Sequence, residues 1–225
     1  MYLPTTASNL PRSTPGSAAS LPESVPPSLE RHGRGSEIYK AGDDGLAWRV
    51  CLGAVRLDQH CEGETRFAGV AVAGDIIGAE TLMFGRYTYT ARALSEVTLE
   101  PWSSSLDEVA PGKLMQMLSG IERRSVESIA LRSGTAERRI GQLLGLIGRG
   151  LALGRSKVRV ALPTLRDIAE ITGLTIETVS RTIKSLRGNG ELEMVGERQA
   201  REVWVESPPS LADGLTRRGA AGAGR

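Results

Sequence analysis

The chain has 225 residues, 40% of them hydrophobic, which is enough to bury one large or two small apolar cores. Its formal net charge is only +2, so charge alone does not identify a partner. No stretch approaches the roughly 20 apolar residues that span a membrane, and two cysteines cannot build a disulfide framework. The N-terminus lacks a signal-peptide pattern. We therefore expect a cytoplasmic protein with no membrane partner.

Both ends of the chain are predicted to be flexible tails. Residues 1–30 hold six of the eleven prolines and six serines, a composition that buries too little apolar surface to fold. Residues 207–225 are rich in Pro, Gly and Ala, and the same prediction applies to them.

Residues 31–105 have the pattern of a small β domain. Alternating apolar segments predict strands over 48–57, 65–72, 74–78, 87–94 and 97–102, with a turn over 59–63. Short strands interrupted by glycine favour a small antiparallel barrel or jelly roll.

A long helix is predicted within residues 106–133, beginning near Pro111. Its apolar residues recur at helical spacing and form a stripe along one face. The stripe consists of Leu114, Leu118, Ile121, Val126 and Ile129. Such a stripe packs either on the helix's own barrel or on a second copy of the same helix, and the sequence leaves both open.

Residues 134–206 contain a helix-turn-helix pattern. Thr164 is placed to cap a first helix, with Asp167 three residues later as a short-armed capping box. Gly173 then ends that helix, because glycine readily adopts the left-handed conformation. Thr175 is placed to cap a second helix that carries Glu177 in its first turn.

Two short alternating segments, 191–196 and 201–205, follow a loop signal at 188–190 and predict a β-hairpin. A helix-turn-helix followed by a hairpin is a winged helix. Its wing is expected to lie along a phosphate backbone.

The outward face of the second helix carries side chains that suit base recognition. Arginine donates twice to guanine, glutamate accepts from cytosine and serine serves either role, so Glu177, Ser180 and Arg181 are predicted to read bases. Neighbouring polar and basic residues are assigned to the DNA backbone: Thr164, Thr175, Thr178, Lys184, Arg198 and Arg201. The alternative is an ordinary solvated helix face.

At this point the sequence resembles a known family. The run Gly-Leu-Thr-Ile-Glu-Thr-Val-Ser-Arg, residues 173–181, is similar to the recognition helix of the Fnr and FixK branches of the Crp/Fnr superfamily of bacterial transcription regulators. In those branches the Glu, Ser and Arg of an E-x-x-S-R motif read a TTGAT half-site, and these roles fall on Glu177, Ser180 and Arg181. Residues 133–144 resemble the helix that leads into the family's DNA domain, and residues 41–102 resemble a degenerate sensor barrel.

The resemblance implies an α+β fold. It consists of an N-terminal cyclic-nucleotide-binding-like jelly roll (31–105), a dimerisation helix (106–133) and a C-terminal winged helix-turn-helix (134–206). It also implies a homodimer on double-stranded DNA, a TTGAT-N4-ATCAA-like palindrome, and RNA polymerase as a partner in activation.

The sequence says less about the signal that would control such a regulator. Cyclic-nucleotide-binding members carry a Gly-Glu pair and an Arg-Ser or Arg-Thr pair, whereas this chain has Gly78-Ala79 and Arg86-Tyr87-Thr88. An iron–sulfur cluster of the Fnr type needs four thiolates, and the chain has two cysteines. We therefore expect no cofactor. No motif of an enzyme active site is present.

A redox or metal role remains open for Cys51, His60 and Cys61, although an exposed turn explains the last two as well. The alternative function is thus a ligand-, redox- or haem-gated regulator, whose DNA binding depends on an effector in the barrel.

Overall fold

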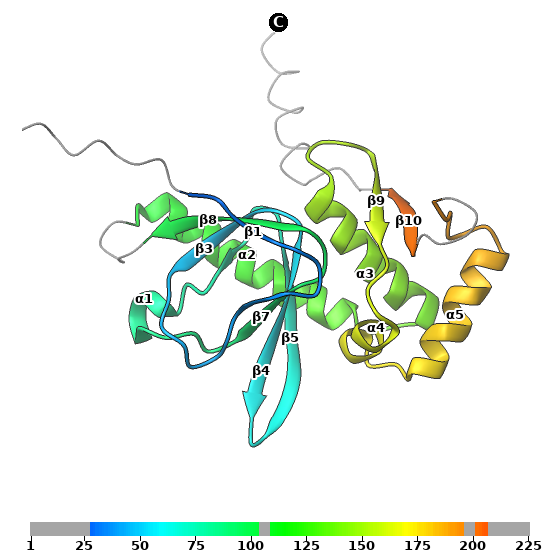
Figure 1. Ribbon diagram of the computed structural model, residues 1–225, viewed down its shortest axis with the longest axis horizontal. Helices are drawn as coiled ribbons and strands as arrows, with labels where there is room; N and C mark the ends of the chain where they lie inside the picture. The colour runs from blue at the N-terminus through cyan, green and yellow to red at the C-terminus, as the bar shows by residue number, and fades with distance from the viewer. Residues whose placement is uncertain (1–27, 104–108, 196–200, 207–225) are drawn as a thin grey trace, which may run out of the picture.

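A computed structural model describes residues 28–103, 109–195 and 201–206 of the chain. The predicted tails therefore lie outside the described residues, apart from 28–30, and so does Arg198. A β-rich part and a mainly helical part lie side by side (Figure 1).

The β-rich part confirms the predicted jelly roll, because two four-stranded antiparallel sheets face each other across an apolar core. One sheet has the order β1-β8-β3-β6, formed by Glu30–His32, Val97–Ser103, Ala47–Leu52 and Ile76–Ile77. The other has the order β2-β7-β4-β5, formed by Glu37–Tyr39, Thr90–Ala93, Ala54–Cys61 and Glu64–Val72. A short helix α1, Thr81–Phe84, follows β6.

The single strand predicted over 48–57 is wrong, because the chain turns at Gly53 and divides it into β3 and β4, which belong to different sheets. The turn predicted over 59–63 is wrong in its extent. Strand β4 continues to Cys61 and β5 begins at Glu64, so Glu62 and Gly63 alone connect them. Both residues have positive φ, 53° and 82°, which is the backbone of a tight two-residue hairpin turn. His60 and Cys61 are therefore strand residues near the tip of a hairpin that projects from the barrel (Figure 1).

Helix α2, Pro111–Ala130, confirms the predicted long helix and begins at the expected proline. None of its residues is buried. One face lies on β5, and Arg123 and Arg124 reach the buried carboxylate of Asp75, between β5 and β6, at 2.6 and 3.3 Å. The apolar stripe remains exposed, with fractional exposures from 38% for Leu114 to 68% for Ile129.

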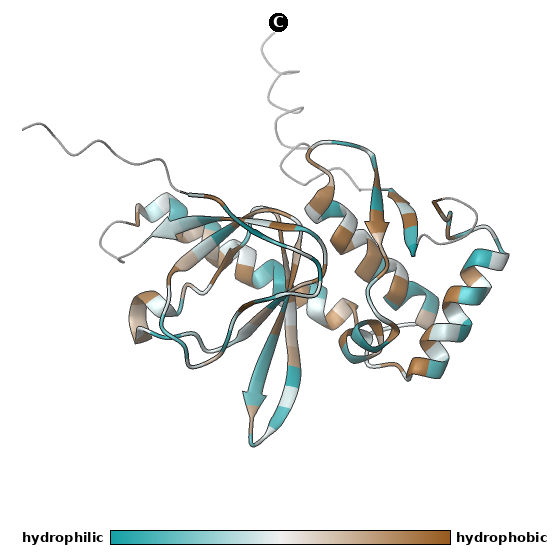
Figure 2. Ribbon diagram, viewed as in Figure 1, coloured by the Kyte–Doolittle hydropathy of each residue, from teal (hydrophilic) through white to brown (hydrophobic). Residues whose placement is uncertain are grey.

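The helical part contains α3 (Ala136–Leu151), α4 (Leu165–Thr172) and α5 (Ile176–Gly188), with strands β9 (Lys157–Ala161) and β10 (Glu202–Glu206). Apolar residues recur along α3 and on the neighbouring β9 (Figure 2). Strand β9 was not predicted, although it alternates strictly between exposed and buried residues.

The predicted wing hairpin is only partly correct. Residues on its two arms do pair, because the Val195 amide donates to Glu202 O at 3.0 Å and the Trp204 amide donates to Glu193 O at 2.8 Å. The main partner of β10 is β9, however, which pairs with it along its whole length. The wing is thus anchored by a strand that precedes the helix-turn-helix.

The two parts share one apolar core. Ala54, Val70 and Val72 of the barrel belong to the same buried cluster as the inner face of α3. The Gly53 amide donates to Gly150 O at 2.8 Å, and a Cβ on Gly150 would lie 2.2 Å from Gly53 O. Glycine at 150 therefore allows the α3 backbone to approach the barrel closely.

Candidate nucleic-acid interface

Local capping builds the α4–α5 unit as predicted. The Thr164 hydroxyl accepts from the Asp167 amide at 3.0 Å, and the Thr175 hydroxyl accepts from the Thr178 amide at 3.2 Å. Gly173 ends α4 in the left-handed conformation, with φ of 67°. Val179 and the apolar residues that follow it at helical spacing turn inward to the core. The direction in which α5 starts is therefore fixed by its own sequence.

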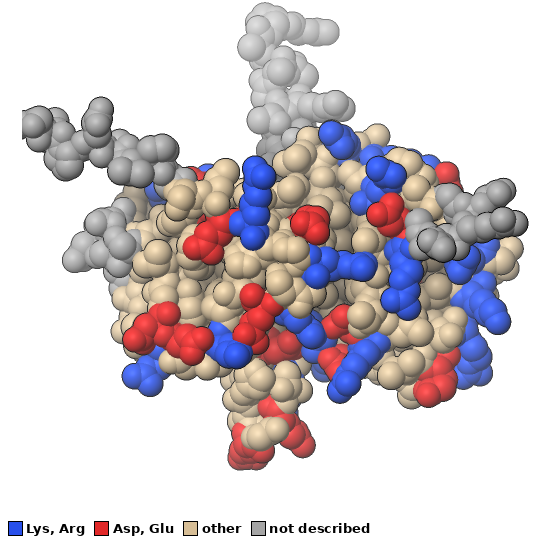
Figure 3. All heavy atoms as spheres, viewed as in Figure 1, with Lys and Arg blue, Asp and Glu red and all other residues tan. Residues whose placement is uncertain are grey.

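The other face of α5 is open to solvent and carries the predicted base-reading residues. Glu177, Ser180 and Arg181 are exposed together, as is Lys184 one turn further along. Within the described part of the chain, neither Arg181 nor Lys184 forms an ion pair. Lys and Arg side chains gather at this edge of the molecule (Figure 3). These cations are therefore available to a polyanion.

Glu177 is held as a carboxylate. The hydrogen bond from its own backbone N–H is the largest cause that lowers the pKa of Glu177. The hydrogen bond from the Thr175 hydroxyl and the charge of the nearby Arg181 lower this pKa further. An ionised glutamate accepts hydrogen bonds and does not donate them, which suits the amino group of cytosine.

The residues assigned to the DNA backbone do not all lie on one surface. Thr175 and Thr178 stand at the start of α5, with their hydroxyl oxygens 3.1 Å apart. Thr164 and Arg201 instead line a cavity of about 810 Å³ between the barrel and α4. Arg198 lies outside the described residues. Phosphate contacts by these residues remain predictions.

One exposed residue of α5 escaped prediction. Ile176, next to Glu177 in the first turn, is 46% exposed. An exposed apolar side chain on such a helix is suited to contact a thymine methyl group. Ile176 lies three residues before the buried Val179, and this helical spacing assigns it to the buried face of α5. The sequence pattern therefore gave no sign that it is exposed.

The structure does not gather Cys51, His60 and Cys61 into a site. Cys51 lies on β3 and Cys61 at the end of β4, and both are free thiols. Burial, and then the hydrogen bond to Glu100, raise the pKa of the Cys51 thiol. His60 bonds to the hydroxyls of Thr90 and Thr65 at 2.9 and 3.1 Å. Among the described residues, no group of three metal-ligating side chains could hold a metal ion.

A jelly roll joined by a long helix to a winged helix-turn-helix defines the class of two-domain DNA-binding regulators. Residues 137–213 match the Crp-like helix-turn-helix domain family. The chain is 33% identical over 181 residues to the nitrogen fixation regulation protein FixK of Azorhizobium caulinodans, covering 74% of this chain and 71% of that protein. It is 29% identical over 194 residues to FixK of Rhizobium meliloti, covering 84% and 88%.

The similarity extends to a second regulator and to solved structures. The fumarate and nitrate reduction regulatory protein of Escherichia coli K12 is 28% identical over 192 residues, covering 80% of this chain and 75% of that protein. The structure of FixK2 from Bradyrhizobium japonicum matches with a TM-score of 0.59 at 26% identity, over 85% of this chain and 98% of that one. The chain therefore belongs to the Crp/Fnr superfamily, in its Fnr/FixK-like branch, and is a DNA-binding transcription regulator. No helix within the described residues is long and apolar enough to cross a membrane.

Proposed function

We propose that this regulator binds as a homodimer to a palindrome of the TTGAT-N4-ATCAA type and acts there with RNA polymerase to control transcription initiation. The observation that carries the proposal is the joint exposure of Glu177, Ser180 and Arg181 on one face of α5. These side chains have the spacing of the E-x-x-S-R motif. Each half-site would be read by one copy of α5.

The exposed stripe of α2 supports the homodimer. The five residues of the stripe, and Met115 beside them, are each at least 38% exposed. Contiguous apolar surface of this kind marks an interaction site, and a second copy of α2 would cover it symmetrically. Two recognition helices related by that axis would reach half-sites about one DNA turn apart, which requires a palindrome.

Binding of the full chain to labelled duplexes tests this proposal by fluorescence anisotropy at a fixed salt concentration. The palindrome should bind on the order of 1,000-fold more tightly than a scrambled duplex of equal length. A duplex with a single half-site should give intermediate affinity. Equal affinity for the palindrome and the scrambled duplex would overturn the proposal.

A cavity of about 370 Å³ between the barrel and α2 favours a second candidate, a regulator gated by an effector. Its lining includes Tyr39, Tyr89, Ile121 and Arg124, and small-molecule sites occupy roughly 300–1,000 Å³. Calorimetry with cyclic nucleotides, and an absorbance spectrum of freshly purified protein for haem, test it. A ligand that changes affinity for the palindrome would support gating, whereas DNA binding unchanged by every ligand would favour constitutive action.

A further inference from the structure

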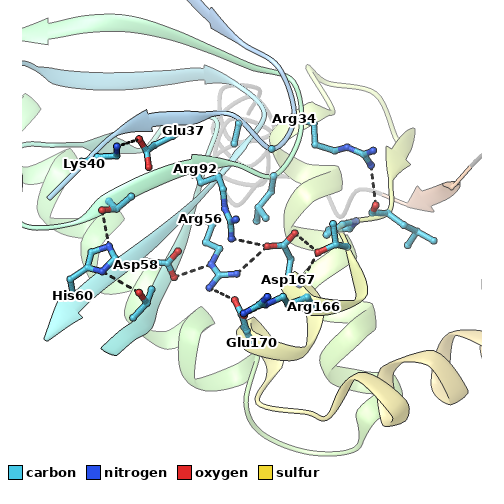
Figure 4. Close-up of a pocket in the computed structure, with 18 of the residues that line it drawn as sticks. Arg34, Glu37, Lys40, Arg56, Asp58, His60, Arg92, Arg166, Asp167 and Glu170 are labelled. Atoms are coloured by element: carbon cyan, nitrogen blue, oxygen red, sulfur yellow. Dashed lines mark hydrogen bonds and ion pairs between the residues drawn. The ribbon is translucent and has the colours of Figure 1, made fainter. Parts of the chain in front are cut away.

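A buried arginine joins the barrel to the first helix of the helix-turn-helix. Arg56, near the start of β4, is 2% exposed. Its Nε lies 2.9 Å from Asp58 on the same strand, whereas its Nη1 and Nη2 cross to α4. There they meet Asp167 at 3.1 Å and Glu170 at 2.7 Å (Figure 4).

Two further arginines of the barrel part reach the start of α4 or the residues just before it. Arg92 of β7 contacts Asp167 at 2.8 Å, and Arg34, between β1 and β2, donates to Leu162 O at 3.0 Å. The carboxylates of α4 are thus held by side chains from two neighbouring strands.

The other charged side chains that line the cavity between the barrel and α4 leave these ion pairs in place. Glu37 pairs with Lys40 at 3.2 Å on the barrel side, and Arg201 lines the wall next to α4. Arg166, on α4 itself, holds the second oxygen of Glu170 at 2.9 Å. Burial opposes ionisation of Glu170, but hydrogen bonds from Arg166 and Arg56 keep its pKa below the ordinary value. The carboxylate is therefore charged at neutral pH.

The orientation of α4 determines that of the recognition helix. Ile168 and Ala169 of α4 pack in one buried cluster with Val179 and Ile183 of α5, so the two helices move as a unit. The barrel is attached to α2 through the ion pairs of Asp75. The contacts between the barrel and α4 therefore fix the position of the recognition helix α5 relative to the exposed stripe of α2.

We propose that Arg56, Arg92, Asp167 and Glu170 form an interdomain latch that sets which half-site spacing the dimer accepts. The proposal rests on the proposed function, because it needs a dimer on a palindrome. Inserting one base pair between half-sites moves them apart by roughly 3.4 Å and rotates one by about 35°. If the latch holds the two recognition helices in a fixed relation, such a change of spacing lowers the affinity of the dimer strongly. Without the latch, the same change of spacing lowers the affinity less.

The double variant D167N/E170Q tests the latch with little change of shape. The amide introduced at position 167 would retain an oxygen for the Thr164 hydroxyl, and Arg56 would keep Asp58 as its partner. Affinities are measured for palindromes whose half-sites are separated by three, four and five base pairs. The wild-type chain should favour one spacing, and the ratio between that spacing and its neighbours should fall by about fivefold or more in the variant. Preference for TTGAT over a scrambled half-site should not change.

The control E62Q/E64Q removes two negative charges as well, but from the tip of the β4–β5 hairpin, and should keep the wild-type spacing ratio. A folded D167N/E170Q protein with an unchanged ratio would overturn the latch. If that variant does not fold, R92Q/E170Q removes two of the interdomain ion pairs at side chains that are 38% and 39% exposed, and an unchanged ratio there would also overturn the latch. A wild-type chain with no preference for TTGAT would instead refute the proposed function.

Discussion

Leu118→Asp is expected to separate the dimer. Leu118 lies within the exposed stripe of α2 and is 49% exposed in the single chain. Fully burying a leucine contributes about 1.5–3 kcal/mol, so covering the exposed half contributes about 1 kcal/mol in each protomer. Two-fold symmetry doubles that loss to about 2 kcal/mol. Two carboxylates facing apolar surface add at least about 1 kcal/mol each.

The total, about 4 kcal/mol, corresponds to a rise of roughly 1,000-fold in the dimer dissociation constant. Sedimentation velocity over a concentration series measures it directly. The variant should also bind the palindrome no better than a single half-site, because only one recognition helix then acts at a time.

Gln116→Asp is the matched control. It introduces the same residue two positions earlier, about 200° around the helix, on a side that the stripe does not reach. It should leave association unchanged. If Leu118→Asp associates as the wild-type chain does, the stripe of α2 is not the dimer contact.

Four other outcomes are expected, three at the interface and one in the barrel. Arg181→Ala should weaken palindrome binding by about 1–3 kcal/mol and relax discrimination at the base it reads, as shown by competition with substituted duplexes. Lys184→Ala should instead weaken specific and scrambled duplexes alike and reduce the salt dependence by about one phosphate contact, so an effect confined to the palindrome would contradict this. Because the folded pKa of Glu177 lies below its ordinary value, its carboxylate interactions should persist from neutral pH downward and disappear only as pH falls through that lowered pKa. A loss of half-site preference between pH 8 and 6 would therefore have another origin. Iodoacetamide at pH 7.5 should modify the exposed Cys61 before Cys51, whose pKa is raised by burial, with mass spectrometry showing the order.

The helix-turn-helix was predictable because its signals are local. Thr164, Gly173 and Thr175 set the ends of α4 and α5 within a dozen residues, and the structure has the same caps. The jelly roll was predictable as a class for a similar reason, since alternation and glycines mark short strands. The extent of β4 was missed because His60 and Cys61 are polar and exposed at a hairpin tip, where alternation ends.

The contacts between the two parts of the chain had no local signal. Arg56 reads as an ordinary charged residue of a strand, and its partner Asp167 is 111 residues away. The same holds for Thr164 and Arg201, which look like candidates for phosphate contact and line the interdomain cavity in the structure. Strand β9 did show alternation, but it is only five residues long and its pairing partner β10 lies about 45 residues further along the chain, so no hairpin signal accompanies it.

The close approach of Gly53 and Gly150 also bears on how this regulator can be recombined. A DNA-binding domain transplanted from a relative at the junction of α2 and α3 would bring its own residue to position 150. Any Cβ there would meet the barrel backbone at 2.2 Å. Exchange between such regulators must therefore keep glycine at position 150 or move α3 together with the barrel loop that it contacts. The segment that can be exchanged without this constraint begins after α3, with β9 and the helix-turn-helix that β9 supports.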